Sequence, residues 1–117
     1  MGYESRFERF EAAGPDGSVR QVEFRRAGFL TAGDRPELYF FSSTTSGLGE
    51  EIVVGISGSA LRSFERTRRC LTREEKIDVA GAMLRGAIEA GRPLDSGNLL
   101  IREDELAAIA GALGIPA

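Results

Sequence analysis

The chain has 117 residues, of which 42% are hydrophobic and 28% are charged. This length suits one domain with a core of its own, and the balance of residues is that of a folded protein and not of a disordered one. The formal net charge of −3 argues against a general attraction of the whole protein to nucleic acid or to acidic membranes.

The first half of the chain has the pattern of β-strands. The segments YESRFERFEA and VRQVEFRRAGF are rich in aromatic and β-branched residues, and Gly14–Gly17 (GPDG) between them is typical of a tight turn. Val22 and Phe24 should share one face of the second strand, with polar residues on the other face. Two further segments, ELYFFSS and EEIVVGIS, flank the turn sequence Thr44–Gly49. The pattern predicts a four-stranded antiparallel sheet built from two hairpins.

From Ser57 onward the apolar residues recur at helical spacing. The segment SGSALRSFERTRR predicts a short helix, with Ser57 or Ser59 as its N-cap. Thr72 and Glu75 have the spacing of a capping box, in which each side chain accepts a hydrogen bond from the backbone of the other residue. This signal predicts a long helix close to residues 73–90.

The C-terminal part completes an α+β pattern. The segment 98–101 (NLLI) fits either a short strand or an extended linker, and the spacing of apolar residues predicts a last helix over roughly 103–113. We therefore predict one domain over residues 1–117, with the sheet in 1–57 and a mainly helical part in 58–117. Two or three C-terminal helices should pack on one face of the four-stranded sheet.

Several classes of chemistry are excluded by composition. Histidine is absent and Cys70 is the single cysteine. This rules out histidine-based triads and dyads, histidine-containing metal sites, zinc ribbons, iron–sulfur clusters and an intramolecular disulfide. The segment GISGS lacks the second glycine of a nucleophile elbow, and SGLGEE lacks the Gly-Lys-Ser/Thr ending of a phosphate loop. We expect no catalytic residue, no cofactor and no metal.

Arginines gather in one segment, Arg62–Lys76, with the sequence RSFERTRRCLTREEK. Between Ser59 and Arg73 the formal charge is +4, so the rest of the chain carries −7. If the first helix continues through this stretch, Arg62, Arg66 and Arg69 lie on one flank at i, i+4 and i+7. We predict that these three residues bind an anion or a partner. The alternative is a solvated helix face whose charge is partly answered by neighbouring glutamates.

Cys70 lies in the same segment, directly after Arg68 and Arg69. These two cations could stabilise its thiolate. A lone cysteine between two helices is more often a small buried apolar residue, and we expect that role for Cys70.

The function that best fits these patterns is that of a small cytoplasmic, non-catalytic interaction or accessory protein. Its partner would be another protein or a second copy of this chain, bound through a sheet edge or an apolar helix face. One alternative is a nucleic-acid-binding module that uses the arginine-rich helix edge, and another is a small enzyme with carboxylate, arginine or tyrosine chemistry. No segment is long enough to span a bilayer and the start lacks the apolar region of a signal peptide, so we expect no membrane partner.

Overall fold

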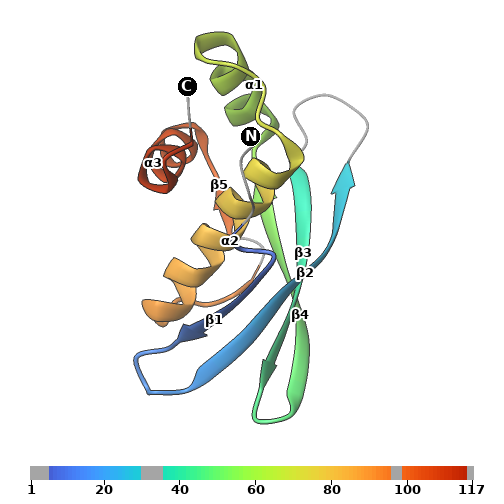
Figure 1. Ribbon diagram of the computed structural model, residues 1–117, viewed down its shortest axis with the longest axis vertical. Coiled ribbons are helices and arrows are strands. Elements are labelled where there is room, and N and C mark those ends of the chain that lie inside the picture. Colours follow the sequence, from blue (N-terminus) through green and yellow to red (C-terminus); the bar gives the residue numbers. More distant parts are fainter. Residues whose placement is uncertain (1–5, 30–35, 96–98, 116–117) are drawn as a thin grey trace.

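The computed structural model describes residues 6–29, 36–95 and 99–115. Within them the chain forms an α+β fold, which confirms the predicted class (Figure 1). The elements in chain order are β1 (Arg9–Ala13), β2 (Val19–Phe29), β3 (Glu37–Thr45), β4 (Leu48–Ile56), α1 (Gly58–Thr67), α2 (Arg73–Glu89), β5 (Leu100–Ile101) and α3 (Glu103–Leu113).

The sheet has the order β1-β2-β3-β4-β5, with the first four strands antiparallel and β5 parallel to β4. Both predicted hairpins are present. The second turns through Ser46 and Gly47, which both have positive φ as a tight two-residue hairpin turn requires. The segment that fitted either a strand or a linker supplies β5, because α2 carries the chain back along the sheet to the outer edge of β4.

The helices begin where the sequence predicts. The Ser57 hydroxyl accepts a hydrogen bond from the Ala60 amide at 3.4 Å, which makes Ser57 the N-cap of α1. The capping box of α2 is complete: the Thr72 amide donates to Glu75 Oε1 at 2.8 Å, and the Glu75 amide donates to Thr72 Oγ1 at 3.2 Å. Gly114, in the left-handed conformation with φ of 74°, ends α3.

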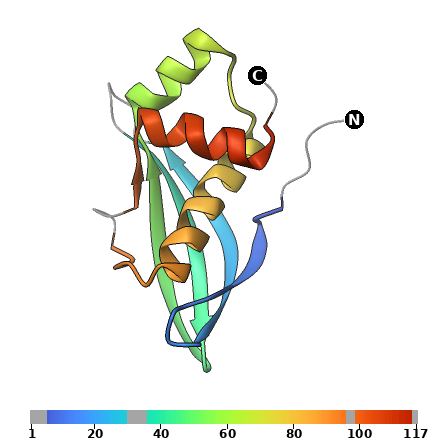
Figure 2. The same ribbon diagram turned by 90° about the vertical axis from the view of Figure 1, so that its left-hand side faces the viewer.

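All three helices lie on one side of the sheet, as Figures 1 and 2 show. We call this side the covered face and the opposite side the open face. The core between sheet and helices includes side chains that are at most 2% exposed: Tyr39, Phe41, Ile52, Val54, Ile77 and Leu84. Within the described residues, no helix is both long enough and apolar enough to cross a membrane.

Strand β2 contains a bulge that the alternating pattern did not predict. The register with β3 shifts between Phe24 and Arg26, so that Arg25 has no partner residue across the ladder. Val22 and Phe24 share the covered face, as expected. Beyond the bulge the alternation changes phase, and Ala27 instead of Arg26 packs against the core.

The first strand begins later than the sequence suggested. Residues 6 and 7 do not join the ladder, because their amides donate to the buried carboxylate of Asp78 in α2, at 2.9–3.0 Å from Arg6 and 2.9 Å from Phe7. Phe7 packs directly on Gly81, one turn further along α2. A guanidinium nitrogen of Arg6 also donates to the Leu113 carbonyl at the end of α3, at 2.6 Å. The segment that precedes β1 therefore ties α2 to α3.

Candidate functional site

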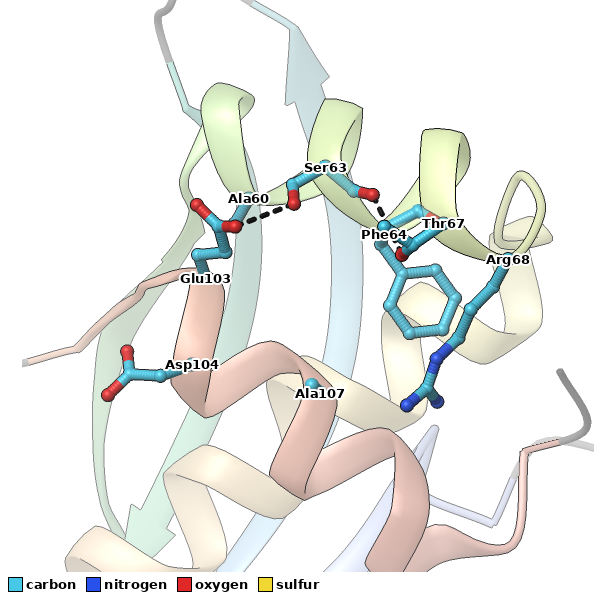
Figure 3. Close-up of a pocket in the computed structure, with 8 residues that line it drawn as sticks. All are labelled: Ala60, Ser63, Phe64, Thr67, Arg68, Glu103, Asp104 and Ala107. Carbon is cyan, nitrogen blue, oxygen red and sulfur yellow. Dashed lines mark hydrogen bonds between the residues drawn. The ribbon is translucent and has the colours of Figure 1, made fainter.

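A groove of about 520 Å³ lies between α1 and α3 (Figure 3). The end of the sheet places both helices there. The Ser57 amide donates to the Ile101 carbonyl at 2.9 Å, so β4 and β5 end side by side and α1 and α3 begin side by side. The residues that line the groove are Ala60, Ser63, Phe64, Thr67 and Arg68 from α1 and its C-cap, and Glu103, Asp104 and Ala107 from α3.

The groove has an apolar centre and oppositely charged ends. Phe64 is only 5% exposed and presents its ring between the two helices. The Arg68 guanidinium carbon lies 5.1 Å from the centroid of that ring. The carboxylates of Glu103 and Asp104 lie toward the other end of the groove, as Figure 3 shows. The three charged side chains are exposed, so the groove is an open surface feature and not an enclosed cavity.

The hydroxyls of the groove are already engaged in helix contacts. Ser63 donates to Glu103 Oε1 at 2.6 Å and so links α1 to α3. Thr67 donates back to the Ser63 carbonyl at 3.0 Å, within its own helix. Both hydroxyls therefore serve contacts between or within the helices: Ser63 donates to a carboxylate at the exposed rim, and Thr67 donates to a backbone carbonyl of its own helix.

The structure separates the three arginines that the sequence placed together. Arg62 and Arg66 lie on α1, and at about 100° per residue they point to the side of the helix opposite the groove. The helix ends at Thr67, so the premise that it continues through Arg69 is wrong. The guanidinium of Arg69 instead forms two hydrogen bonds with the Glu75 carboxylate, at 2.8 and 2.7 Å.

The pair of Arg69 and Glu75 has a structural role. Glu75 is 2% exposed and also accepts the hydrogen bond of the α2 capping box. The hydrogen bond from Arg69 holds the pKa of Glu75 below its usual value, against the opposing effect of burial, and the same bond raises the pKa of Arg69. This contact fixes the loop between α1 and α2 to the start of α2. Sequence spacing alone did not distinguish Arg69 from Arg68, which reaches the groove.

The expectation that Cys70 is buried is wrong, because its side chain is exposed. Its neighbouring arginines do not stabilise the thiolate either. A hydrogen bond with the Glu65 carboxylate raises the pKa of the Cys70 thiol above its ordinary value, with a smaller contribution from desolvation. At neutral pH the thiol form is favoured, which makes Cys70 a weak nucleophile.

The sequence did not predict a polar network on the covered face. The Tyr39 hydroxyl donates to Glu37 Oε1 at 2.7 Å, and the Lys76 ammonium donates to the same oxygen at 3.1 Å. Burial, followed by the hydrogen bond to Glu37, raises the pKa of Tyr39 strongly, so its phenol stays protonated. Tyr39 is 1% exposed and out of reach of a substrate, which assigns the network to holding α2 on the sheet. The other tyrosine of the chain, Tyr3, lies outside the described residues.

No group of three or more potential metal-ligating side chains occurs in the part of the chain that the structure describes. Comparisons of the sequence with protein-family models and with curated proteins, and of the fold with solved structures, found no match.

Proposed function

We propose that this protein is a non-catalytic interaction protein that binds a segment of a partner protein in the groove between α1 and α3. The observation that carries the proposal is the arrangement of charge around the apolar centre of the groove, with Arg68 toward one end and Glu103 and Asp104 toward the other. The volume of about 520 Å³ is in the range of sites that hold small molecules or a few side chains.

The chemistry of the groove defines the segment that would fit. An apolar side chain of the partner would pack against Phe64 and Ala107. An acidic group on one side of it would pair with Arg68, and a basic group on the other side would pair with Asp104. Such rim charges contribute more to orientation and to the rate of association than to affinity. The fit is therefore to a short peptide segment with an acidic, an apolar and a basic residue in that spatial order.

A binding role is supported over catalysis by the exposure of the charged groups in the groove. Catalytic acids and bases usually combine burial with a specific charged neighbour, which shifts their pKa values toward the pH at which they act. Arg68, Glu103 and Asp104 are exposed. The buried carboxylates outside the groove, Glu75 and Asp78, are both held by contacts within the fold.

One observation favours nucleic acid as an alternative partner. Arg62 and Arg66 lie one turn apart on the exposed side of α1, and α1 has no acidic residue in its first turn. The two surfaces are on opposite sides of the same helix, so one pair of substitutions distinguishes them. Arg68→Glu reverses a charge in the groove, and Arg66→Glu reverses a charge on the far side.

The experiment selects peptides from a random displayed library on the wild-type protein and measures their affinities for both variants. We expect an acidic, apolar and basic pattern among the selected peptides, with affinity about tenfold or more lower for Arg68→Glu and unchanged for Arg66→Glu. A single-stranded nucleic acid of about 20 nucleotides is tested in parallel over a range of salt. Salt-sensitive binding of this probe that is lost in Arg66→Glu, with no peptide selected, would replace the proposal by its alternative.

A further inference from the structure

Strand β1 forms one edge of the sheet, because it pairs with β2 and with no other described strand. In Figure 2 it runs along one side of the sheet, and no described helix lies beyond it. The opposite edge is β5, which has only two residues. An uncovered edge strand presents a row of backbone donors and acceptors that a further strand can use. The five residues of β1 therefore offer the larger of the two edges.

The hydrogen bonds at the two ends of β1 show which of its backbone groups point outward. The Phe24 amide of β2 donates to the Glu8 carbonyl at 2.7 Å, and the Gly14 amide donates to the Ser18 carbonyl at 2.8 Å. In an antiparallel ladder the backbone groups of alternate residues point to the same neighbouring strand. The even-numbered residues from Glu8 to Gly14 therefore point their N–H and C=O groups to β2. The residues whose backbone groups point to the outer edge are Arg9, Glu11 and Ala13.

The side chains of β1 carry opposite charges two positions apart. Arg9 and Glu11 are both exposed, and as alternate residues they share the open face of the sheet. The Arg9 guanidinium lies 2.7 Å from a carboxylate oxygen of Glu23, the residue directly across the ladder in β2. Glu11 lies across from the neutral Gln21 and takes part in no ion pair among the described residues. The edge therefore presents a basic residue followed by an acidic residue whose charge its own chain leaves unanswered.

We propose that β1 is the interface of a homodimer, in which the β1 strands of two copies pair antiparallel about a two-fold axis at Phe10 and join their sheets into one. In this register Arg9 lies opposite Glu11 of the partner subunit, and the reciprocal contact forms by symmetry. Both residues point their backbone groups outward, so each exchanges an N–H donor and a C=O acceptor with the partner. Glu11 thereby gains a cation, and Arg9 lies between Glu23 and Glu11 of the partner subunit.

The charges favour this register over its neighbours. A two-fold axis at Arg9 would set that residue opposite Arg9 of the partner subunit, and an axis at Glu11 would set it opposite Glu11 of the partner subunit. Like charges directly opposite one another destabilise a strand pair. Charged residues on an edge usually prevent self-association, whereas the order of Arg9 and Glu11 makes this edge complementary to itself. That complementarity favours a second copy of this chain over an unrelated strand.

Phe10 supplies an apolar contact at the same axis. Its side chain is half-buried on the covered face, where its ring centroid lies 5.3 Å from that of Phe7 and 6.4 Å from that of Phe41. Two-fold symmetry sets Phe10 opposite Phe10 of the partner subunit as a non-hydrogen-bonded pair, the kind in which side chains lie closest. The contact is small beside the roughly 800 Å² that each partner buries in a standard interface. The dimer should accordingly dissociate on dilution.

The test is sedimentation velocity from about 1 to 500 µM protein, a range that brackets micromolar dissociation constants, with a reductant to prevent crosslinking through the exposed Cys70. We expect a monomer–dimer equilibrium for the wild-type chain. Glu11→Pro removes an amide that points to the outer edge and none that bonds to β2, so this variant should keep the wild-type circular dichroism and stay monomeric. A wild-type chain that is monomeric at the highest concentration, or a Glu11→Pro variant that dimerises like the wild-type chain, would overturn the proposal.

Charge reversal tests the register. Arg9→Glu and Glu11→Arg each place like charges opposite one another in a homodimer, so each variant alone should dimerise about tenfold or more weakly than the wild-type chain. In an equimolar mixture of the two variants, the acidic edge of one faces the basic edge of the other. The mixture should therefore form a heterodimer at least as strong as the wild-type homodimer.

An equimolar mixture of Glu51→Arg and Arg85→Glu is the matched control. These variants carry the same changes of charge on exposed residues of β4 and α2. Each variant alone and their mixture should show the wild-type equilibrium. A mixture of Arg9→Glu and Glu11→Arg that stays monomeric, or a control pair that responds in the same way as these two variants, would overturn the proposal.

Discussion

Phe40 and Phe41 are neighbours in β3, yet they belong to two different surfaces. Phe41 is 0% exposed and contacts Phe10 and Phe24 with nearly perpendicular rings, at 6.4 and 5.7 Å between centroids. Phe40 lies on the open face, with the Arg26 guanidinium stacked on its ring. Residue type and sequence position are almost the same, so the difference in role comes from the period of two along a strand.

The comparison also separates two degrees to which an apolar residue stabilises the fold. On the covered face, the side chain is removed from water completely and its burial stabilises the fold directly. On the open face, the same side chain keeps part of its area in water and contributes less. A substitution should consequently lower the free energy of unfolding more on the covered face than on the open face.

The largest expected effect distinguishes the two phenylalanines. Phe41→Ala should lower the free energy of unfolding by about 3–5 kcal/mol, because it leaves a cavity in the core. Phe40→Ala should cost about 1 kcal/mol or less, since its ring is already partly in water. Urea unfolding measures the loss of stability in both variants. Equal losses of stability in the two variants would show that the open face is covered in a way the structure does not contain.

Two glycines sharpen the comparison at a smaller scale. Gly81 lies on the covered side, where an added Cβ would be 2.4 Å from the Cβ of Phe7. Gly81→Ala should displace the segment that precedes β1 and cost about 1–3 kcal/mol, as overpacked positions do. Gly28→Ala meets only the movable edge of the Phe40 ring, 3.2 Å away on the open face, and should change stability by less than about 0.5 kcal/mol.

Hydrogen exchange of the Arg6 and Phe7 amides gives a local measurement for the same two variants, Gly81→Ala and Gly28→Ala. Both amides donate to Asp78, so they should be protected in the wild-type chain and in Gly28→Ala. They should exchange rapidly in Gly81→Ala. Retained protection in Gly81→Ala would mean that α2 shifts while the N-terminal segment stays in place.

The sequence predicted the features whose signals are local. The capping box of Thr72 and Glu75 marks the start of α2, and the spacing of apolar residues marks α3 at 103–113. Each of these signals is formed by residues that lie only a few positions apart in the sequence. The hairpins follow from turn residues for the same reason. The sequence also predicted Ser57 or Ser59 as the N-cap of α1, and the structure shows that it is Ser57.

The features that sequence reasoning missed depend on contacts between distant segments. Asp78 is held by amides more than seventy positions earlier in the chain, and its role could not follow from its place on a helix. The predicted helical flank of Arg62, Arg66 and Arg69 does not form for a similar reason, because the end of α1 at Thr67 turns Arg68 toward α3 and Arg69 toward Glu75. The bulge at Arg25 has no local signature, and it changes which residues of β2 reach the open face.

The smallest expected effect is on the stability of the fold at acidic pH. It compares a carboxylate on the covered side of the sheet with one on the open face. Hydrogen bonds from arginines lower the pKa of Glu75, which bonds to Arg69, and of Glu23, which bonds to Arg25. A folded-state pKa below the unfolded value of about 4.3 means that each contact stabilises the fold above that pH and that the stabilisation is lost as pH falls through the folded pKa. Glu75 is buried whereas Glu23 is at the surface, so salt should screen the contribution of Glu23 far more strongly.

In thermal melts between pH 7 and 2.5 at high salt, Glu75→Gln should therefore flatten the loss of stability below about pH 4.3, and Glu23→Gln should leave it unchanged. Glutamine can still complete the capping box with Thr72, so this variant isolates the titrating charge from the helix cap. If Glu23→Gln flattens the acid limb as much as Glu75→Gln does, the pair of Arg69 and Glu75 behaves as an ordinary surface contact, and the structural role assigned to it would be wrong.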